Sequence, residues 1–130
     1  MILEVYDLEC LANLFTYTGY CPKEDKYYQF VICSWRNDLK ELYNHLTSRK
    51  IIMIGFNNLG YDYCLIHHIL NHYDEYQYLT GLEAATRLYD KSQFIIEQEF
   101  SEIAEKNRLI PQIDLYKVWH YSNPARKCSC

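Results

Sequence analysis

Residues 51–62 read IIMIGFNNLGYD, and this stretch decides the fold. Its first six residues form a continuous apolar run, which is typical of a strand buried on both faces. Two asparagines end the run, and an apolar stripe at helical spacing then predicts a helix from about Leu59 to about Asn71. A buried strand that leads directly into a helix indicates an α/β protein.

Strands are also expected on both sides of this unit. Ile2 to Glu9 is the first, and Asn13 to Tyr20 and Tyr27 to Trp35 follow as segments rich in aromatic and β-branched residues. The polar turn at residues 21–26 makes these strands an antiparallel meander. A final strand is predicted from Gln112 to Trp119.

Two more helices complete the pattern. Asp38 and Glu41 fit a capping box ahead of one helix, and Gly81 to about Lys106 has a helical pattern that Pro111 ends. This order of elements predicts one α/β domain over residues 1–130, with a mixed β-sheet and flanking helices. Such a sheet normally carries one more helix after its last strand, and we expect that C-terminal helix to be missing.

The composition excludes several classes of protein. A hydrophobic content of 49% argues against disorder, and no apolar run approaches the ~20 residues that span a membrane. The N-terminus lacks the pattern of a signal peptide, and six irregularly spaced cysteines are typical of reduced thiols, so we expect a cytoplasmic protein, in the host cytoplasm if viral. The net charge of −4 disfavours a protein that covers phosphates with Lys and Arg.

Acidic residues stand where core residues are expected. Asp7 and Glu9 are two apart on a strand, so both carboxylates leave the same face and continue the row of Leu3 and Val5, which we expect to face the core. Asp62 stands above the apolar stripe of its helix and should point toward the sheet. Its place is near the carboxyl ends of the buried strands, where ligands of α/β sheets bind.

Three converging carboxylates repel one another and lose hydration, and a hard divalent cation relieves both penalties. Two Mg²⁺ or Mn²⁺ ions ~4 Å apart can stabilise the attacking and leaving oxygens in phosphodiester hydrolysis. The ordinary alternatives are a solvated Asp-x-Glu loop and an aspartate that interacts with the helix dipole. The combination of acids on both elements favours a metal site.

Residues 5–9, VYDLE, and residues 56–62, FNNLGYD, resemble two sequence motifs of the DEDD, or DnaQ-like, 3′–5′ exonuclease superfamily, which has a ribonuclease H-like fold. The chain looks most like the proofreading domain of family B DNA polymerases, especially the phage protein-primed type. The resemblance covers nearly the whole chain and implies a metal-dependent 3′–5′ exonuclease that hydrolyses the 3′ end of single-stranded DNA.

The resemblance also implies roles for single residues. Asp7, Glu9 and Asp62 would be the catalytic acids and the ligands of a two-metal Mg²⁺ or Mn²⁺ site, with Glu9 also orienting the attacking water. Asn58 and Tyr61 would contact the 3′-terminal nucleotides. Leu8 would wedge against the terminal base.

Departures from the family pattern lie mainly at the C-terminal end. Cys10 stands where the first motif often has threonine, and neither His120 nor Tyr121 begins the expected third motif with its fourth acid. Arg126 to Ser129 is similar to the approach to a substrate-binding motif. We therefore expect a chain that is weak or inactive alone, completed by a second polypeptide that supplies the missing helix or by a polymerase domain.

Other residues allow alternative sites. His68 and His72 have the i, i+4 spacing of zinc ligands, although exposed helix histidines fit the sequence better. Cys128-x-Cys130 is a weak metal signal, and Asp114 fits a supporting or solvated role better than a ligand role. The alternative function is a non-catalytic module that binds single strands or a polymerase on the same scaffold.

Overall fold

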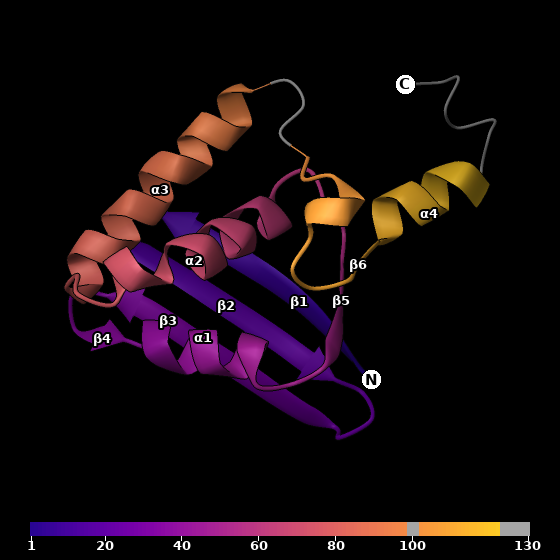
Figure 1. Cartoon of the computed structure of the whole chain (residues 1–130), viewed down its shortest axis with the longest axis horizontal. Helices are drawn as coiled ribbons and strands as arrows, with labels where there is room; N and C mark the ends of the chain where they lie inside the picture. The colour runs from indigo at the N-terminus through magenta and orange to yellow at the C-terminus, as the bar shows by residue number, and fades with distance from the viewer. Residues whose placement is uncertain (99–101, 123–130) are drawn as a thin grey trace.

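A computed structural model describes residues 1–98 and 102–122 of the chain. Its six strands form one sheet in the order β4-β3-β2-β1-β5-β6 (Figure 1). The first four are antiparallel neighbours, and β5 is parallel to both β1 and β6, so the sheet is mixed. The strands are β1 (Ile2–Leu11), β2 (Leu14–Cys21), β3 (Lys26–Cys33), β4 (Arg36–Asn37), β5 (Ile51–Gly55) and β6 (Gln112–Asp114).

The predicted α/β class with a mixed sheet and flanking helices is confirmed, and the arrangement is compatible with a ribonuclease H-like sheet. No helix in the described ranges is long and apolar enough to cross a membrane. The helices are α1 (Leu39–Thr47), α2 (Asp62–Tyr76), α3 (Gly81–Glu97), α4 (Leu115–Ser122) and the 3-10 turn η1 (Glu105–Asn107).

Side-chain hydrogen bonds fix the starts of α3 and α1 in different ways. A capping box opens α3, in which Thr80 Oγ1 accepts from the Glu83 N–H at 3.2 Å and the Glu83 carboxylate accepts from the Thr80 N–H at 3.0 Å. The capping box predicted at Asp38 is wrong. That side chain accepts from the Val31 N–H instead, which fastens the start of α1 to β3.

One face of the sheet carries the core. Helices α1, α2 and α3 pack on this face, and β1 contributes the buried row Glu4, Tyr6 and Leu8. The prediction that Asp7 and its row face the core is therefore wrong. Both rows of β1 contain apolar residues. The row that contains Glu4 can be buried because Tyr17, His45 and Arg49 contact its carboxylate inside the protein.

The opposite face, which we call the open face, carries the other row of β1. Leu3 is 44% exposed and Val5 is 41% exposed, and Asp7 lies exposed on the same row. The register of the sheet adds residues of four more strands to this face. They are Thr16, Thr18, Tyr20, Tyr27, Gln29, Ile52, Ile54 and Ile113.

The last strand is shorter than predicted. Instead of running to Trp119, β6 ends at Asp114, and α4 begins at Leu115. Asp114 causes the change, because its carboxylate accepts from the Tyr116 N–H at 3.0 Å and so stabilises the first turn of a helix. A helix thus follows the last strand, but it projects away from the sheet toward the C-terminus (Figure 1). Residues 123–130, which include Arg126 to Ser129, lie outside the described residues.

Candidate functional site

The acidic residues gather where β1 extends past its neighbour β5. The last pair between these strands is Val5 with Ile54, whereas β1 continues to Leu11. The segment between β5 and α2 crosses this vacated edge. There the carboxylate of Asp62 accepts a hydrogen bond from the backbone N–H of Leu8, as expected for a helix that begins at the carboxyl end of a strand.

Electrostatic repulsion is concentrated on Asp62. Burial, followed by the neighbouring charges of Asp7 and Asp114, raises the pKa of its carboxyl group to about 6, against hydrogen bonds from backbone N–H groups of Leu8 and of Asp62 itself. The Asp7 charge therefore lies close enough to act on the Asp62 carboxyl group. The predicted convergence of the acids on a metal stays a prediction. A cation placed between these two carboxylates would relieve this repulsion.

Glu9 lies two residues further along the exposed row of β1, opposite Thr16 of β2. Among residues 1–98 and 102–122, no group of three or more His, Cys, Asp or Glu side chains is placed to hold a metal ion. Asp7 and Asp62 thus offer two carboxylates to a hard cation. The three-ligand, two-metal site stays a prediction.

Asp114 holds the segment between β5 and α2. Its Oδ1 atom accepts from the Asn57 N–H at 2.8 Å, and its Oδ2 atom accepts from the Leu59 N–H at 3.2 Å. Asn57 has a positive φ of 57°, a left-handed conformation that asparagine tolerates better than most residues. The supporting role expected for Asp114 fits this geometry. The signal in the sequence is an acid directly after a short strand.

Asn58 is completely buried, so its part in the site is to hold the segment in place. Its amide nitrogen donates to Gln112 Oε1 at 2.9 Å, and the Tyr6 hydroxyl donates to the same oxygen at 2.8 Å. The side chain also packs on Gly55, where an added Cβ would lie 2.9 Å from the Asn58 Cβ. The predicted contact of Asn58 with a nucleotide stays a prediction.

Tyr61 and Leu8 are also packed into the protein. Tyr61 is partly buried against the core and its hydroxyl hydrogen-bonds Ser92 of α3, and burial raises its pKa. Leu8 is 6% exposed and belongs to the hydrophobic core. Neither the stacking role of Tyr61 nor the wedge role of Leu8 is tested by this geometry.

The exposed aromatic residues in this region are Phe56 and Tyr116, and not Tyr61. Phe56 follows β5 and is 63% exposed, and Tyr116 opens α4 and is 39% exposed. Their rings meet edge to face, with centroids 5.4 Å apart and planes at 83°. The sequence places Phe56 in the second motif, but only the structure pairs it with Tyr116.

Packing explains the positions of His68 and His72, the alternative zinc ligands. Burial lowers the pKa of His68 to about 4, and its Nε2 atom lies 2.9 Å from the Tyr76 hydroxyl. The His72 ring stacks on the His68 ring, with centroids 4.3 Å apart. These contacts explain the i, i+4 pair without a metal. Cys128 and Cys130 lie outside the described residues.

Comparison with known proteins found no matching family model, no matching curated protein and no matching solved structure. The functional argument for this chain therefore rests on its own residues and their geometry.

The repulsion at Asp62 predicts that Asp62→Asn stabilises the folded chain near pH 7.5, on the order of 1 kcal/mol after allowance for solvent screening. The carboxyl pKa rises from 3.8 to about 6 on folding, so stability falls as pH rises through that window. Asparagine has no charge, and its Oδ1 still accepts from Leu8. Urea unfolding near pH 7.5 and pH 4 measures the effect. The gain should largely vanish at the lower pH, and an equal change at both would contradict the repulsion.

Proposed function

We propose that this chain is part of a metal-dependent 3′–5′ exonuclease that acts on the 3′ end of single-stranded DNA, in proofreading or a related process. The observation that carries the proposal is the carboxyl group of Asp62, whose pKa is raised to about 6 beside Asp7 and Asp114. Carboxylates that converge in a buried place repel one another, and a bound cation relieves that repulsion.

Asp7 and Asp62 fit a hard cation, because both are carboxylates and Asp114 already uses its two oxygens for backbone N–H groups. We propose Mg²⁺ or Mn²⁺, with Glu9 as the third acid of the site. The bound metal would supply stabilisation of charge on phosphate oxygens. The carboxylates of this chain would hold the metal and orient water.

The exposed apolar residues of the open face support the proposal that a partner covers it. Leu3, Val5 and Ile113 are exposed in the same zone of the sheet that carries Asp7. Apolar residues that gather on an exposed face are typical of an interaction surface. We propose that a helix of a second polypeptide, or a polymerase domain, covers this face and supplies a further acid. No disulfide joins the cysteines in the described part of the chain, which supports a reducing compartment such as the cytoplasm, or the host cytoplasm for a viral protein.

The test is shortening of a 5′-labelled single-stranded DNA in Mn²⁺. We expect slow, stepwise loss from the 3′ end by the wild-type chain, and loss of this activity in Asp7→Asn. Asp74→Asn, at an exposed aspartate of α2, is the matched control and should retain the activity. Thermal unfolding of the same samples reports metal binding, because a ligand of the folded state raises stability.

Different results of these assays would contradict the cleavage activity and the metal site. Cleavage that survives in Asp7→Asn would come from a contaminant or another site. A folded wild-type chain that neither cleaves nor gains stability with Mn²⁺ would refute the metal site. One observation then favours the alternative, a non-catalytic module that binds single strands or a polymerase: the described residues hold no group of three metal ligands.

A further inference from the structure

Two exposed aromatic rings border the acidic site on the open face. The parallel register pairs Val5 of β1 with Ile54 of β5. Phe56 is the first residue after β5 and begins the segment that leads to Asp62 at the start of α2. Tyr116 reaches the same place from α4, because its ring meets the Phe56 ring at 5.4 Å.

One carboxylate oxygen fixes both aromatic residues. Asp114 Oδ1 accepts from the N–H of Asn57, the residue after Phe56, at 2.8 Å and from the N–H of Tyr116 at 3.0 Å. The pair is thus anchored through its backbone while its rings stay exposed. Exposed aromatic rings held in this way lose little conformational entropy when a flat ligand stacks on them.

We propose that Phe56 and Tyr116 form a stacking platform for the unpaired bases at the 3′ end of a single strand. This inference rests on the proposed function and adds to it the residues that hold the bases. Stacking suits this surface, because none of the open-face residues named above is Lys or Arg, while Asp7 and Glu9 are acidic. Affinity from phosphate contacts is therefore weak here, and aromatic stacking contributes ~1–3 kcal/mol per base.

The platform predicts two features of binding. First, affinity should depend little on salt concentration, because few counterions are released. Second, affinity should depend on the bases, so an oligonucleotide whose last two residues lack bases should bind more weakly. These features distinguish the platform from a basic groove, which gives steep salt dependence and tolerates abasic residues.

Fluorescence anisotropy with a 5′-fluorescein oligo(dA) 12-mer tests the proposal. The titrations are made in EDTA and again in Ca²⁺, at two salt concentrations. Phe56→Ala and Tyr116→Ala should each weaken binding about 5-fold to 150-fold, the range that 1–3 kcal/mol represents. Phe56→Trp should retain affinity. Tyr78→Ala removes a ring that is 83% exposed elsewhere on the surface and should change nothing.

The abasic oligonucleotide provides the decisive comparison. It should weaken binding to the wild-type chain but not weaken it further in the double variant F56A/Y116A, because stacked partners are not additive. The platform is overturned if the alanine variants bind like the wild type, if the abasic penalty persists in the double variant, or if the wild type binds no oligonucleotide. The rings would then be a contact for a protein partner.

Cleavage assays keep the two proposals distinguishable. If the platform binds single strands but Mn²⁺ produces no cleavage, the exonuclease proposal fails and the platform stands. If Mn²⁺-dependent cleavage is lost in Asp7→Asn yet is unchanged in both alanine variants, the platform fails and the exonuclease stands. Thermal unfolding of every variant confirms that it is folded.

Discussion

Replacing His45 with leucine should destabilise the folded chain by about 3 kcal/mol, because it removes a partner from a buried carboxylate. Glu4 is fully buried on β1, and His45 Nε2 lies 2.9 Å from its Oε2 atom and 3.0 Å from its Oε1 atom. The loss should appear in urea unfolding as a lower midpoint with an unchanged slope.

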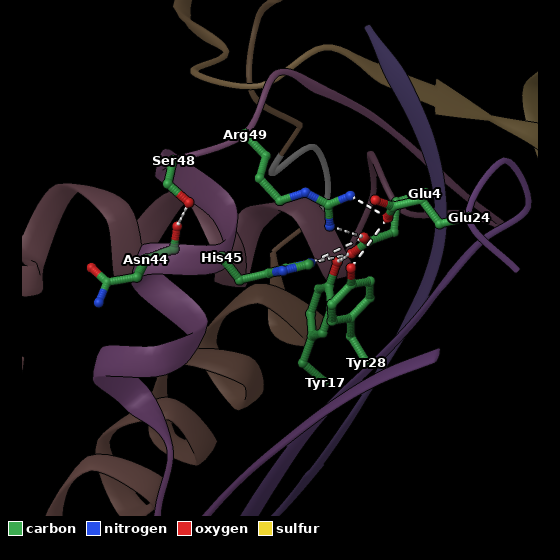
Figure 2. A network of polar contacts seen from close by, with 8 residues as sticks. All are labelled: Glu4, Tyr17, Glu24, Tyr28, Asn44, His45, Ser48 and Arg49. Atoms are coloured by element: carbon green, nitrogen blue, oxygen red, sulfur yellow. Dashed lines mark hydrogen bonds and ion pairs between the residues drawn. The ribbon is translucent and has the colours of Figure 1, made fainter. Parts of the chain in front are cut away.

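The network around Glu4 explains why this effect is large (Figure 2). The Tyr17 hydroxyl donates to Glu4 Oε2, and the Arg49 guanidinium lies 3.6 Å from Oε1. Burial and the Glu4 charge raise the pKa of Tyr17 well above its usual value, so the hydroxyl keeps the proton that it donates. A Cβ at position 19 would lie 2.6 Å from Glu4 Oε2, which explains the glycine inside β2.

A double variant tests whether the loss comes from the unpaired charge. In Glu4→Met combined with His45→Leu, both polar partners become apolar, and most of the lost stability should return. The role of the unpaired Glu4 carboxylate would be contradicted if the double variant were no more stable than His45→Leu. Tyr43→Leu, on the same helix but stacked on Tyr73 instead, is a control for general loss of packing on α1.

The same network marks where sequence reasoning reached its limit. The order of strands and helices followed from periodicity, and the place of Asp62 beside the sheet followed from its helical stripe. The buried face of β1 did not follow, because Glu4 in the row of Tyr6 and Leu8 reads as a solvent-exposed residue. Its partners His45 and Arg49 come from α1 and the segment after it, and no local pattern predicts that they meet.

The candidate site shows a similar division. The place of Asp62 at the start of α2 was predictable from its helical stripe. The exposed face of Asp7 was not, because the period of a strand does not say which of its two rows is buried. The burial of Asn58 and the bonds made by Asp114 were not predictable either, because they depend on the irregular segment between β5 and α2. The short β6 has the same origin, since one side-chain acceptor decides where the strand ends and α4 begins.

Asp114→Ala should destabilise the folded chain by about 2 to 4 kcal/mol, because it removes the acceptor of three backbone N–H groups. The Leu59 N–H bond is buried, so that donor finds no water in exchange. The other two donors are partly buried and lose less. Urea unfolding measures the total, and amide hydrogen exchange at Asn57, Leu59 and Tyr116 shows whether the loss is local.

Asp114→Asn separates hydrogen bonding from charge. Its Oδ1 atom can still accept from Asn57 and Tyr116, so it should lose only the Leu59 bond and about 1 kcal/mol. The lost charge should also lower the pKa of Asp62, because Asp114 is one of the charges that raise it. A carboxyl titration followed by NMR detects that shift.

Comparison of Asp114→Ala with Asp114→Asn therefore distinguishes an anchoring role of Asp114 from a role as a metal ligand. If Asp114 acts by anchoring the segment, the alanine variant should lose single-strand binding and Mn²⁺-dependent cleavage beyond what its stability explains, while the asparagine variant retains both. If Asp114 is instead a metal ligand, asparagine should be almost as damaging as alanine, because a neutral amide is a poorer ligand for a hard cation. Unchanged exchange at all three amides in Asp114→Ala would contradict the anchoring role itself.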